Sequence, residues 1–193
     1  MKRHTFSKMA QPQGLFYLPA TFDGSSIIAS LDQGDWKRVS ESENSRRYQH
    51  FGSTYDYVRR KIVPGADPIP GFLEPLVAHL QAFCVEKGLP SEFNQCIVND
   101  YQPGQGINKH TDIRSYGDVI GCYTFGSGAT MVFRKGDEVY NQYVEPNSLY
   151  VMSGESRTDW THEMPSRKSD KVEGQTVKRG RRVSVTFRFA PSS

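Results

Sequence analysis

The chain has 193 residues, of which 36% are hydrophobic and 12% aromatic, and its formal net charge is +3. This composition supplies a core for one domain of ordinary size and argues against global disorder. The chain has no run of about 18 apolar residues and its N-terminus has no apolar centre, so we expect neither a membrane span nor a signal peptide. Three cysteines without CxxC spacing favour a reducing compartment inside the cell, cytoplasmic or nuclear.

The N-terminal part of the chain is predicted to begin with a flexible arm over residues 1–13. The sequence GLFYLPATF (14–22) then predicts a short strand. Asp23 is placed to cap a helix over residues 24–33.

A second helix is predicted further along the chain. Residues 47–57, RYQHFGSTYDY, predict a strand or hairpin with Gly52 as its turn, and the prolines and glycines of residues 63–71 predict a loop. Apolar residues then recur about every 3.6 positions over residues 72–88, which predicts an amphipathic helix with Pro75 in its first turn.

From residue 93 onward the sequence has the texture of a β protein. Short runs rich in β-branched and aromatic residues are separated by turn signals. These runs are FNQCIVNDY, DVIGCYTFG, ATMVFRK, EVYNQYVE, SLYVMSG and RRVSVTFRFA. Six or more short strands predict an antiparallel sandwich, barrel or jelly roll. We therefore predict a single domain over residues 1–193, mainly β with flanking helices (α+β), and expect a monomer.

The segment EMPSRKSDKVEGQTVKRGR, residues 163–181, is basic and poor in apolar residues. It is interpreted as a mobile surface loop between two strands. Such a loop could lie near bound nucleic acid or could serve only to keep the protein in solution.

The stretch NDYQPGQGINKHTD, residues 99–112, contains a histidine and an aspartate two positions apart. On a strand, His110 and Asp112 would point to the same side and could aim a nitrogen and an oxygen at one metal ion. His162, in DWTHEM, is a candidate third ligand, because a jelly roll can bring a distant strand alongside. Two histidines and one carboxylate are the ligand set of non-haem Fe(II) oxygenases, with zinc as the competing metal.

Two arginines near the C-terminus suggest a binding site for an anion. Arg182 and Arg188 lie six apart in RRVSVTFRF and would share one face of a strand. Guanidinium groups bind carboxylates in a bidentate manner, so a dicarboxylic acid is a suitable ligand. Further polar groups on the expected faces are Ser184, Asn99 and Tyr101.

The motif order NDYQPGQGINKHTD, WTH and RVSVTFR resembles that of the AlkB-like Fe(II)/2-oxoglutarate dioxygenases over roughly residues 45–189. The resemblance implies a double-stranded β-helix (jelly roll) and an enzyme that uses Fe(II), 2-oxoglutarate and O₂. It implies that iron is held by His110, Asp112 and His162. It implies that 2-oxoglutarate lies against Asn99, Tyr101, Arg182 and Arg188, with Ser184 where some members carry asparagine.

Within this family, RRYQHFG, YQPGQGI and VMSGESRTDWTH are similar to the oxygenase domain of the member that acts on the tRNA wobble uridine. That member also carries an RNA-recognition module and a methyltransferase domain, which we expect to be absent here. The family resemblance implies a nucleic-acid partner, DNA or RNA and possibly tRNA.

The aromatic and basic stretch SRRYQHFGSTYDYVRRK is expected to contact an unpaired base and its phosphates. The candidate substrate contacts are Arg46, Arg47, Tyr48, His50, Phe51, Tyr55 and, more distantly in sequence, Arg157. For at least two of the aromatic residues, core packing is the alternative. Trp160 is expected to pack near the metal site.

The leading hypothesis is oxidative demethylation of bases in DNA or RNA, with release of formaldehyde. A competing hypothesis is hydroxylation of a tRNA wobble-uridine modification, which would leave a stable alcohol. A third hypothesis is a protein or small-molecule hydroxylase on the same fold, and a fourth is a jelly-roll binding module without catalysis.

Overall fold

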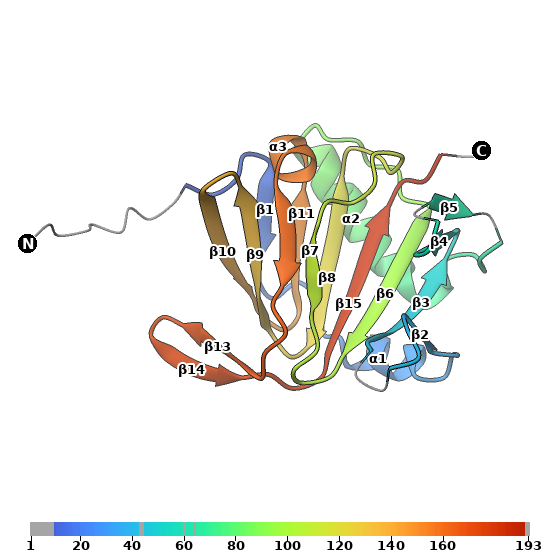
Figure 1. Ribbon diagram of the computed structural model, residues 1–193. Coiled ribbons are helices and arrows are strands. Elements are labelled where there is room, and N and C mark those ends of the chain that lie inside the picture. The colour runs from blue at the N-terminus through green and yellow to red at the C-terminus, as the bar shows by residue number, and fades with distance from the viewer. Residues whose placement is uncertain (1–9, 43–44, 60, 64, 192–193) are drawn as a thin grey trace, which may run out of the picture.

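The computed structural model describes residues 10–42, 45–59, 61–63 and 65–191, and two antiparallel sheets form its body (Figure 1). The larger sheet has the order β1 (Leu15–Leu18), β11 (Ser148–Met152), β8 (Ile120–Gly126), β15 (Arg182–Arg188), β6 (Gln95–Tyr101), β3 (Arg47–Phe51) and β2 (Lys37–Arg38). The smaller sheet has the order β10 (Glu138–Val144), β9 (Ala129–Lys135), β12 (Thr161–Met164) and β7 (Ile107–His110). The six strand-like runs of the sequence therefore correspond to β6, β8, β9, β10, β11 and β15.

Strand β15 separates two hydrophobic clusters, because its side chains alternate between the two faces of the larger sheet. Val183, Val185 and Phe187 belong to the cluster between this sheet and the helices. The intervening residues face the space between the two sheets: Arg182, Ser184, Thr186 and Arg188. All seven residues of β15 are buried, so its polar side chains have been placed inside the sandwich rather than on the surface.

Two helices cover the outer face of the larger sheet, where α2 runs behind β8, β15 and β6 (Figure 1). Helix α1 spans Ser25–Leu31, and Asp23 accepts hydrogen bonds from the backbone N–H and the hydroxyl of Ser25. Helix α2 spans Glu74–Glu86 after the 3₁₀ turn η1 (Gly71–Leu73). Both predicted helices are confirmed, and Pro75 lies in the first turn of α2.

The predicted element over residues 47–57 is a pair of strands in two different sheets. β3 joins β6 in the larger sheet, whereas β4 (Thr54–Asp56) pairs with β5 (Lys61–Val63) to form a small separate hairpin. Gly52, with φ +80°, makes the turn between them, and a Cβ there would collide with the carbonyl oxygen of Asn94. The β4–β5 hairpin extends from the upper end of β3 in Figure 1.

The segment 163–181 contains a second hairpin where the sequence predicted a loop. β13 (Ser169–Val172) pairs with β14 (Gln175–Lys178), and the hairpin projects from the body at the lower left of Figure 1. The hairpin could not be predicted from alternating apolar and polar residues, because one of its faces is polar and the other carries a buried aspartate, Asp170. A short helix, α3 (Gly154–Thr158), was also not predicted from the sequence.

Most of the predicted N-terminal arm, residues 1–9, lies outside the described residues. Within the described part of the chain, no helix combines the length and the apolar character that crossing a bilayer requires. The three cysteines are free and buried. The single domain, the monomeric state and the cellular compartment stay predictions.

Candidate metal centre and adjoining pocket

Three potential metal ligands meet where β7, the edge strand of the smaller sheet, lies beside β12. His110 is the last residue of β7 and is paired directly with His162 of β12 across the antiparallel ladder. Asp112 follows β7 by two residues, in the loop beyond the strand rather than on it as the sequence suggested. One ligand atom from each of the three residues lies within 4.8 Å of the others. Strand pairing therefore explains how His110 and His162, which are 52 positions apart in the sequence, converge.

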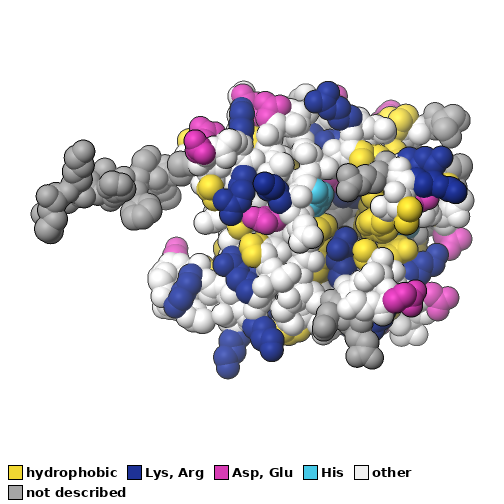
Figure 2. Space-filling view, viewed as in Figure 1, with side chains coloured by type: hydrophobic (Ala, Val, Ile, Leu, Met, Phe, Trp, Pro, Cys, Tyr) yellow, Lys and Arg dark blue, Asp and Glu magenta, His cyan; other side chains and the backbone are white. Residues whose placement is uncertain are grey.

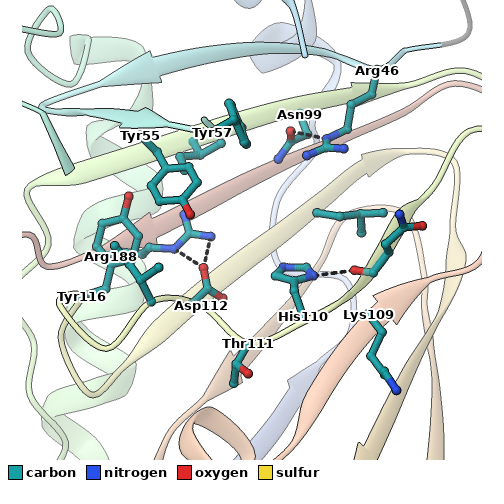
Figure 3. Close-up of a pocket in the computed structure, with 14 residues that line it drawn as sticks. Arg46, Tyr55, Tyr57, Asn99, Lys109, His110, Thr111, Asp112, Tyr116 and Arg188 are labelled. Carbon is teal, nitrogen blue, oxygen red and sulfur yellow. Dashed lines mark hydrogen bonds and ion pairs between the residues drawn. The ribbon is translucent and has the colours of Figure 1, made fainter. Parts of the chain in front are cut away.

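The orientation of His110 is set by its own strand. Its Nδ1 donates to the carbonyl oxygen of Asn108 at 2.7 Å, as Figure 3 shows. This bond places the proton on Nδ1 and leaves the Nε2 lone pair free for a metal ion.

His162 is held as a neutral imidazole. Burial, together with the neighbouring His110, lowers its pKa to about 3. A neutral imidazole is the form that binds metal ions. Its Nε2 lies 3.6 Å from Asp112 Oδ2, close to the spacing of about 3 Å expected for two ligands about 2.1 Å from one metal ion at right angles.

Asp112 is held as a carboxylate by an arginine of the larger sheet. Burial alone would raise the pKa of Asp112, but Arg188 and the two histidines outweigh it and hold the pKa well below its usual range. Arg188 donates from Nε (2.9 Å) and Nη2 (2.8 Å) to Oδ1 (Figure 3). The second oxygen, Oδ2, stays directed toward His162 and is available to a metal ion.

A narrow slot between the sheets continues from the three ligands toward Arg182. Arg182 Nη2 donates to Thr124 Oγ1 at 2.8 Å, and the guanidinium lies 5.6 Å from the ring centre of Tyr101. Asn99 lies across from Ser184 in the β6–β15 ladder, and both side chains line the slot. The four residues that the resemblance implied for 2-oxoglutarate are therefore brought to one place with Ser184.

Buried donors in this slot lack partners among the described residues. Two of them belong to arginines, Arg182 Nε and Arg188 Nη1, and the ring nitrogen Nδ1 of His162 also has no partner. An unpaired buried N–H of a charged group is costly, so its presence on both arginines fits a site built for an anion with two charged ends. The donor set of two imidazoles and a carboxylate likewise fits Fe(II) with open coordination positions.

A larger pocket of about 590 Å³ opens beside the three ligands, and this volume falls within the range of about 300–1,000 Å³ common for ligand sites. His110 and Asp112 form part of its floor, so a bound molecule would meet the metal centre directly (Figure 3). Three aromatic residues line its walls: Tyr55, Tyr57 and Tyr116. Tyr55 and Tyr57 come from the β4–β5 hairpin and the turn after β4, and Tyr116 from the loop after Asp112.

The pocket carries an excess of positive charge. Arg46 and Lys109 both line it, and neither is paired with a carboxylate in the part of the chain that the structure describes. Arg46 instead donates from Nε to Asn99 Oδ1 at 3.0 Å and lies 5.9 Å from the ring centre of Tyr57. Its guanidinium is thus positioned at the pocket wall by neutral groups.

Only two of the substrate contacts predicted from residues 46–55 line this pocket, Arg46 and Tyr55. Arg47 is on the other face of β3, where it pairs with buried Asp100 and lies over Trp36. Phe51 packs against the core under the helices.

The rings of Tyr48 and His50 lie behind the pocket wall. Their ring centres lie 4.6 Å apart with the ring planes tilted by 35°, and both rings pack against Tyr57. Tyr57 was not singled out from the sequence, although it lies in the same aromatic stretch. Strand alternation is the signal that could have grouped Tyr48 and His50 on one face and Phe51 on the other.

Arg157, predicted as a substrate contact, is not among the residues that line the pocket. Its guanidinium is buried and donates to the carbonyl oxygens of residues 112, 113, 116 and 117. Arg157 therefore braces the loop that carries Asp112 and Tyr116. Trp160 is buried in the cluster between the sheets, two residues before His162, and its place beside the metal site stays a prediction.

Comparison with known proteins agrees with this geometry. The family model of the 2OG-Fe(II) oxygenase superfamily matches residues 27–188. Uncharacterized protein L905 of Acanthamoeba polyphaga mimivirus is 32% identical over 161 residues, which are 79% of this chain and 75% of that protein. The tRNA (carboxymethyluridine(34)-5-O)-methyltransferase alkbh8 of Xenopus tropicalis is 32% identical over 199 residues, 92% of this chain. The match spans only 32% of that relative's own length.

A solved structure supports the fold. The structure of OsALKBH1 superimposes with a TM-score of 0.65 at 16% identity and covers 93% of this chain and 98% of the other. The predicted jelly roll is thereby confirmed.

The fold and the family match define a non-haem Fe(II)/2-oxoglutarate-dependent dioxygenase. The chain belongs to the 2OG-Fe(II) oxygenase superfamily and is an AlkB-like member of it. The predicted family, enzyme class and cofactors are confirmed.

Proposed function

We propose that this dioxygenase oxidises alkyl groups on unpaired bases of nucleic acid. The observation that carries the proposal is the aromatic, positively charged pocket whose floor is formed by His110 and Asp112. Aromatic side chains provide stacking surfaces for a base, and cationic side chains attract the phosphates that flank it.

We assign iron binding to His110, Asp112 and His162, and 2-oxoglutarate binding to the slot around Arg182. The cofactors, when bound, supply an oxidising centre at which O₂ hydroxylates a C–H bond while 2-oxoglutarate becomes succinate and CO₂. The protein contributes positioning: Arg188 keeps Asp112 ionised, and Asn108 fixes the tautomer of His110. Arg182 Nε is free to bind the distal carboxylate of 2-oxoglutarate.

The substrate base must leave a stack or come from a single strand to reach this centre. The β4–β5 hairpin supplies Tyr55 above the pocket, with Tyr57 just beyond β4 (Figure 3). The similarity to a relative whose name specifies carboxymethyluridine in tRNA supports RNA as the substrate polymer.

Two reaction outcomes are distinguished by the chemistry of the oxidised group. Hydroxylation of an N-methyl group gives an unstable product that loses formaldehyde and restores the base, which is demethylation. Hydroxylation of a carbon-bound substituent, such as that of a modified wobble uridine, leaves a stable alcohol. The guanidinium of Arg46, held at the pocket wall, disfavours a cationic methylated base and favours a neutral or anionic substituent, so its charge supports the second outcome.

Anaerobic reconstitution with Fe(II) and 2-oxoglutarate, followed by exposure to O₂, tests the proposal. We expect succinate formation to be stimulated by bulk tRNA or by oligonucleotides with alkylated bases, and mass spectrometry of digested RNA identifies the changed base. Formaldehyde indicates demethylation, and an added oxygen retained on the base indicates hydroxylation. Stimulation by peptides or small molecules without any by nucleic acid would support a protein or small-molecule hydroxylase and overturn the proposal.

A further inference from the structure

The β13–β14 hairpin has one face that is entirely polar and basic. In its ladder Ser169 lies opposite Lys178, and Lys171 lies opposite Thr176. Because cross-strand partners and alternate residues share a side, these four side chains point in the same direction. Both lysines are exposed, and Lys171 gives only one of its three N–H donors to Thr176.

The opposite face of the hairpin is anchored to the body. Asp170 is buried and is held by Arg179, which is itself buried and also donates to the carbonyl oxygen of Pro165 at 2.8 Å. Arg167 approaches the same carboxylate at 3.0 Å. The acidic group of β13 is therefore neutralised on the inner face, while the lysines stay directed outward.

The base of the hairpin lies against the turn that leads into β7, the strand that carries His110. The stem of Lys168 lies alongside Gly104, in the turn that leads from β6 into β7. Met164, at the end of β12, is paired with Ile107 at the start of β7. Lys109, on the same strand, is among the residues that line the pocket.

Figure 2 shows the same arrangement on the surface. Lys and Arg side chains gather over the hairpin and the region below its base at the lower left, on the face where a histidine is visible at the pocket. Acidic side chains are sparse in that region of the view. Residues 169–178 contain two carboxylates: Asp170 is buried, and Glu173, in the hairpin turn, is exposed.

We propose that the face of the hairpin formed by Lys171 and Lys178 binds the phosphate backbone of a single-stranded nucleic acid whose reactive base occupies the pocket. This inference rests on the proposed function. Lysines bind phosphates as point charges without reading sequence. The face lacks the aromatic and aliphatic anchors of a protein interface, which is also depleted in lysine, so a nucleic acid fits it better than a protein.

The hairpin would bind only nucleic-acid strands that are long enough to extend beyond the pocket. A trinucleotide centred on the reactive base contacts the pocket alone, whereas a strand of about 12 nucleotides can follow the lysines as well. The hairpin therefore contributes affinity and salt dependence for long substrates and leaves turnover of short ones unchanged.

Binding of fluorescent single strands of both lengths to the Mn(II)-loaded protein, measured against salt concentration, tests this. For Lys171→Glu combined with Lys178→Glu, we expect roughly tenfold weaker binding of the long strand at low salt and a salt slope reduced by about 1.4. Trinucleotide binding should be unchanged. Lys87→Glu, an exposed lysine beyond the C-terminal end of α2, is the control and should bind like the parent. Glu173→Gln should bind the long strand more tightly.

Circular dichroism of each variant establishes that the fold is intact. Equal long-strand affinities and slopes for the parent, the double variant and the Lys87→Glu control would overturn the inference while leaving the proposed function standing. Absence of salt-dependent binding in the parent protein would instead overturn the proposed nucleic-acid function and this inference with it. DNA and RNA strands of the same sequence show which backbone is preferred.

Discussion

Arg188 and Asp112 are joined by two N–H donors that converge on one carboxylate oxygen, 2.9 Å from Nε and 2.8 Å from Nη2. The arginine belongs to the larger sheet, and the aspartate follows the edge strand of the smaller one. The pair thus fixes a metal-ligand candidate in space from the opposite layer of the sandwich. Because both donors bind Oδ1, the second oxygen of Asp112, Oδ2, stays available to a metal ion.

Replacing Arg188 by methionine should weaken metal binding. Without the guanidinium, burial raises the pKa of Asp112 and the carboxylate loses its orientation. Loss of such an orienting partner typically lowers metal affinity about 10–100-fold. We expect this range for Mn(II), measured by electron paramagnetic resonance titration at neutral pH. Arg182→Met is the matched control and should retain parental Mn(II) affinity; equal affinity in the Arg188→Met protein would contradict the role of the pair.

Arg182→Lys should separate 2-oxoglutarate binding from metal binding. Lysine keeps the charge but loses the planar fork and the unpaired Nε donor that the slot presents. We expect the Kd for 2-oxoglutarate, measured by calorimetry on the Mn(II) protein, to rise by about tenfold or more, with Mn(II) affinity unchanged. Ser184→Ala should have a smaller effect in the same experiment. A parental Kd in the lysine variant would show that the distal carboxylate binds elsewhere.

The site residues were most predictable from the sequence where alternate residues of a strand place polar side chains on one face. β15 places its polar residues on one face and its apolar residues on the other. The same two-residue period grouped Arg182 with Arg188 and, on β6, Asn99 with Tyr101. The motif order then linked these residues to a dioxygenase. His162 could be matched to His110 through the same resemblance, and the β7–β12 ladder supplies the physical reason.

The walls of the pocket were not predictable in the same way. β3 is paired in the larger sheet and β4 in a separate hairpin, so one aromatic stretch is divided between the core and the pocket. Whether an arginine meets a substrate, a carboxylate or backbone carbonyls depends on tertiary neighbours. Arg46, Arg47 and Arg157 meet an amide, a carboxylate and four carbonyls, respectively. No local pattern distinguishes these three environments.

Arg157→Ala should destabilise the protein and the metal site together. The change leaves several buried carbonyl oxygens in residues 112–117 without their charged donor. We expect a loss of roughly 3 kcal/mol in the free energy of unfolding, measured in urea, and weaker Mn(II) binding because the loop positions Asp112. Arg114→Ala, in the exposed part of the same loop, should change neither. If Arg157 instead contacted substrate, its removal would weaken oligonucleotide binding and leave stability unchanged.

The metal-free protein should lose stability as pH falls from 6.5 toward 4, in part through His50. Burial, with Arg188 and Lys37 nearby, lowers the pKa of His50 to about 4 from its ordinary value of 6.5. The unfolded chain therefore binds a proton in this range that the folded protein does not, so the free energy of unfolding falls with pH. In the folded state, the ring accepts from the backbone N–H of Tyr55 at 3.3 Å, which requires the neutral imidazole.

His50→Gln should reduce this loss by an amount on the order of 2 kcal/mol, once partial solvent exposure is allowed for. Urea unfolding of variant and parent across the same pH range measures the difference. The comparison isolates His50, because His162, whose pKa is also lowered, is present in both proteins. Because His50 packs against Tyr57, its protonation in the parent would also loosen the pocket wall. Parallel pH profiles for the two proteins would mean that His50 is exposed enough to be protonated without cost.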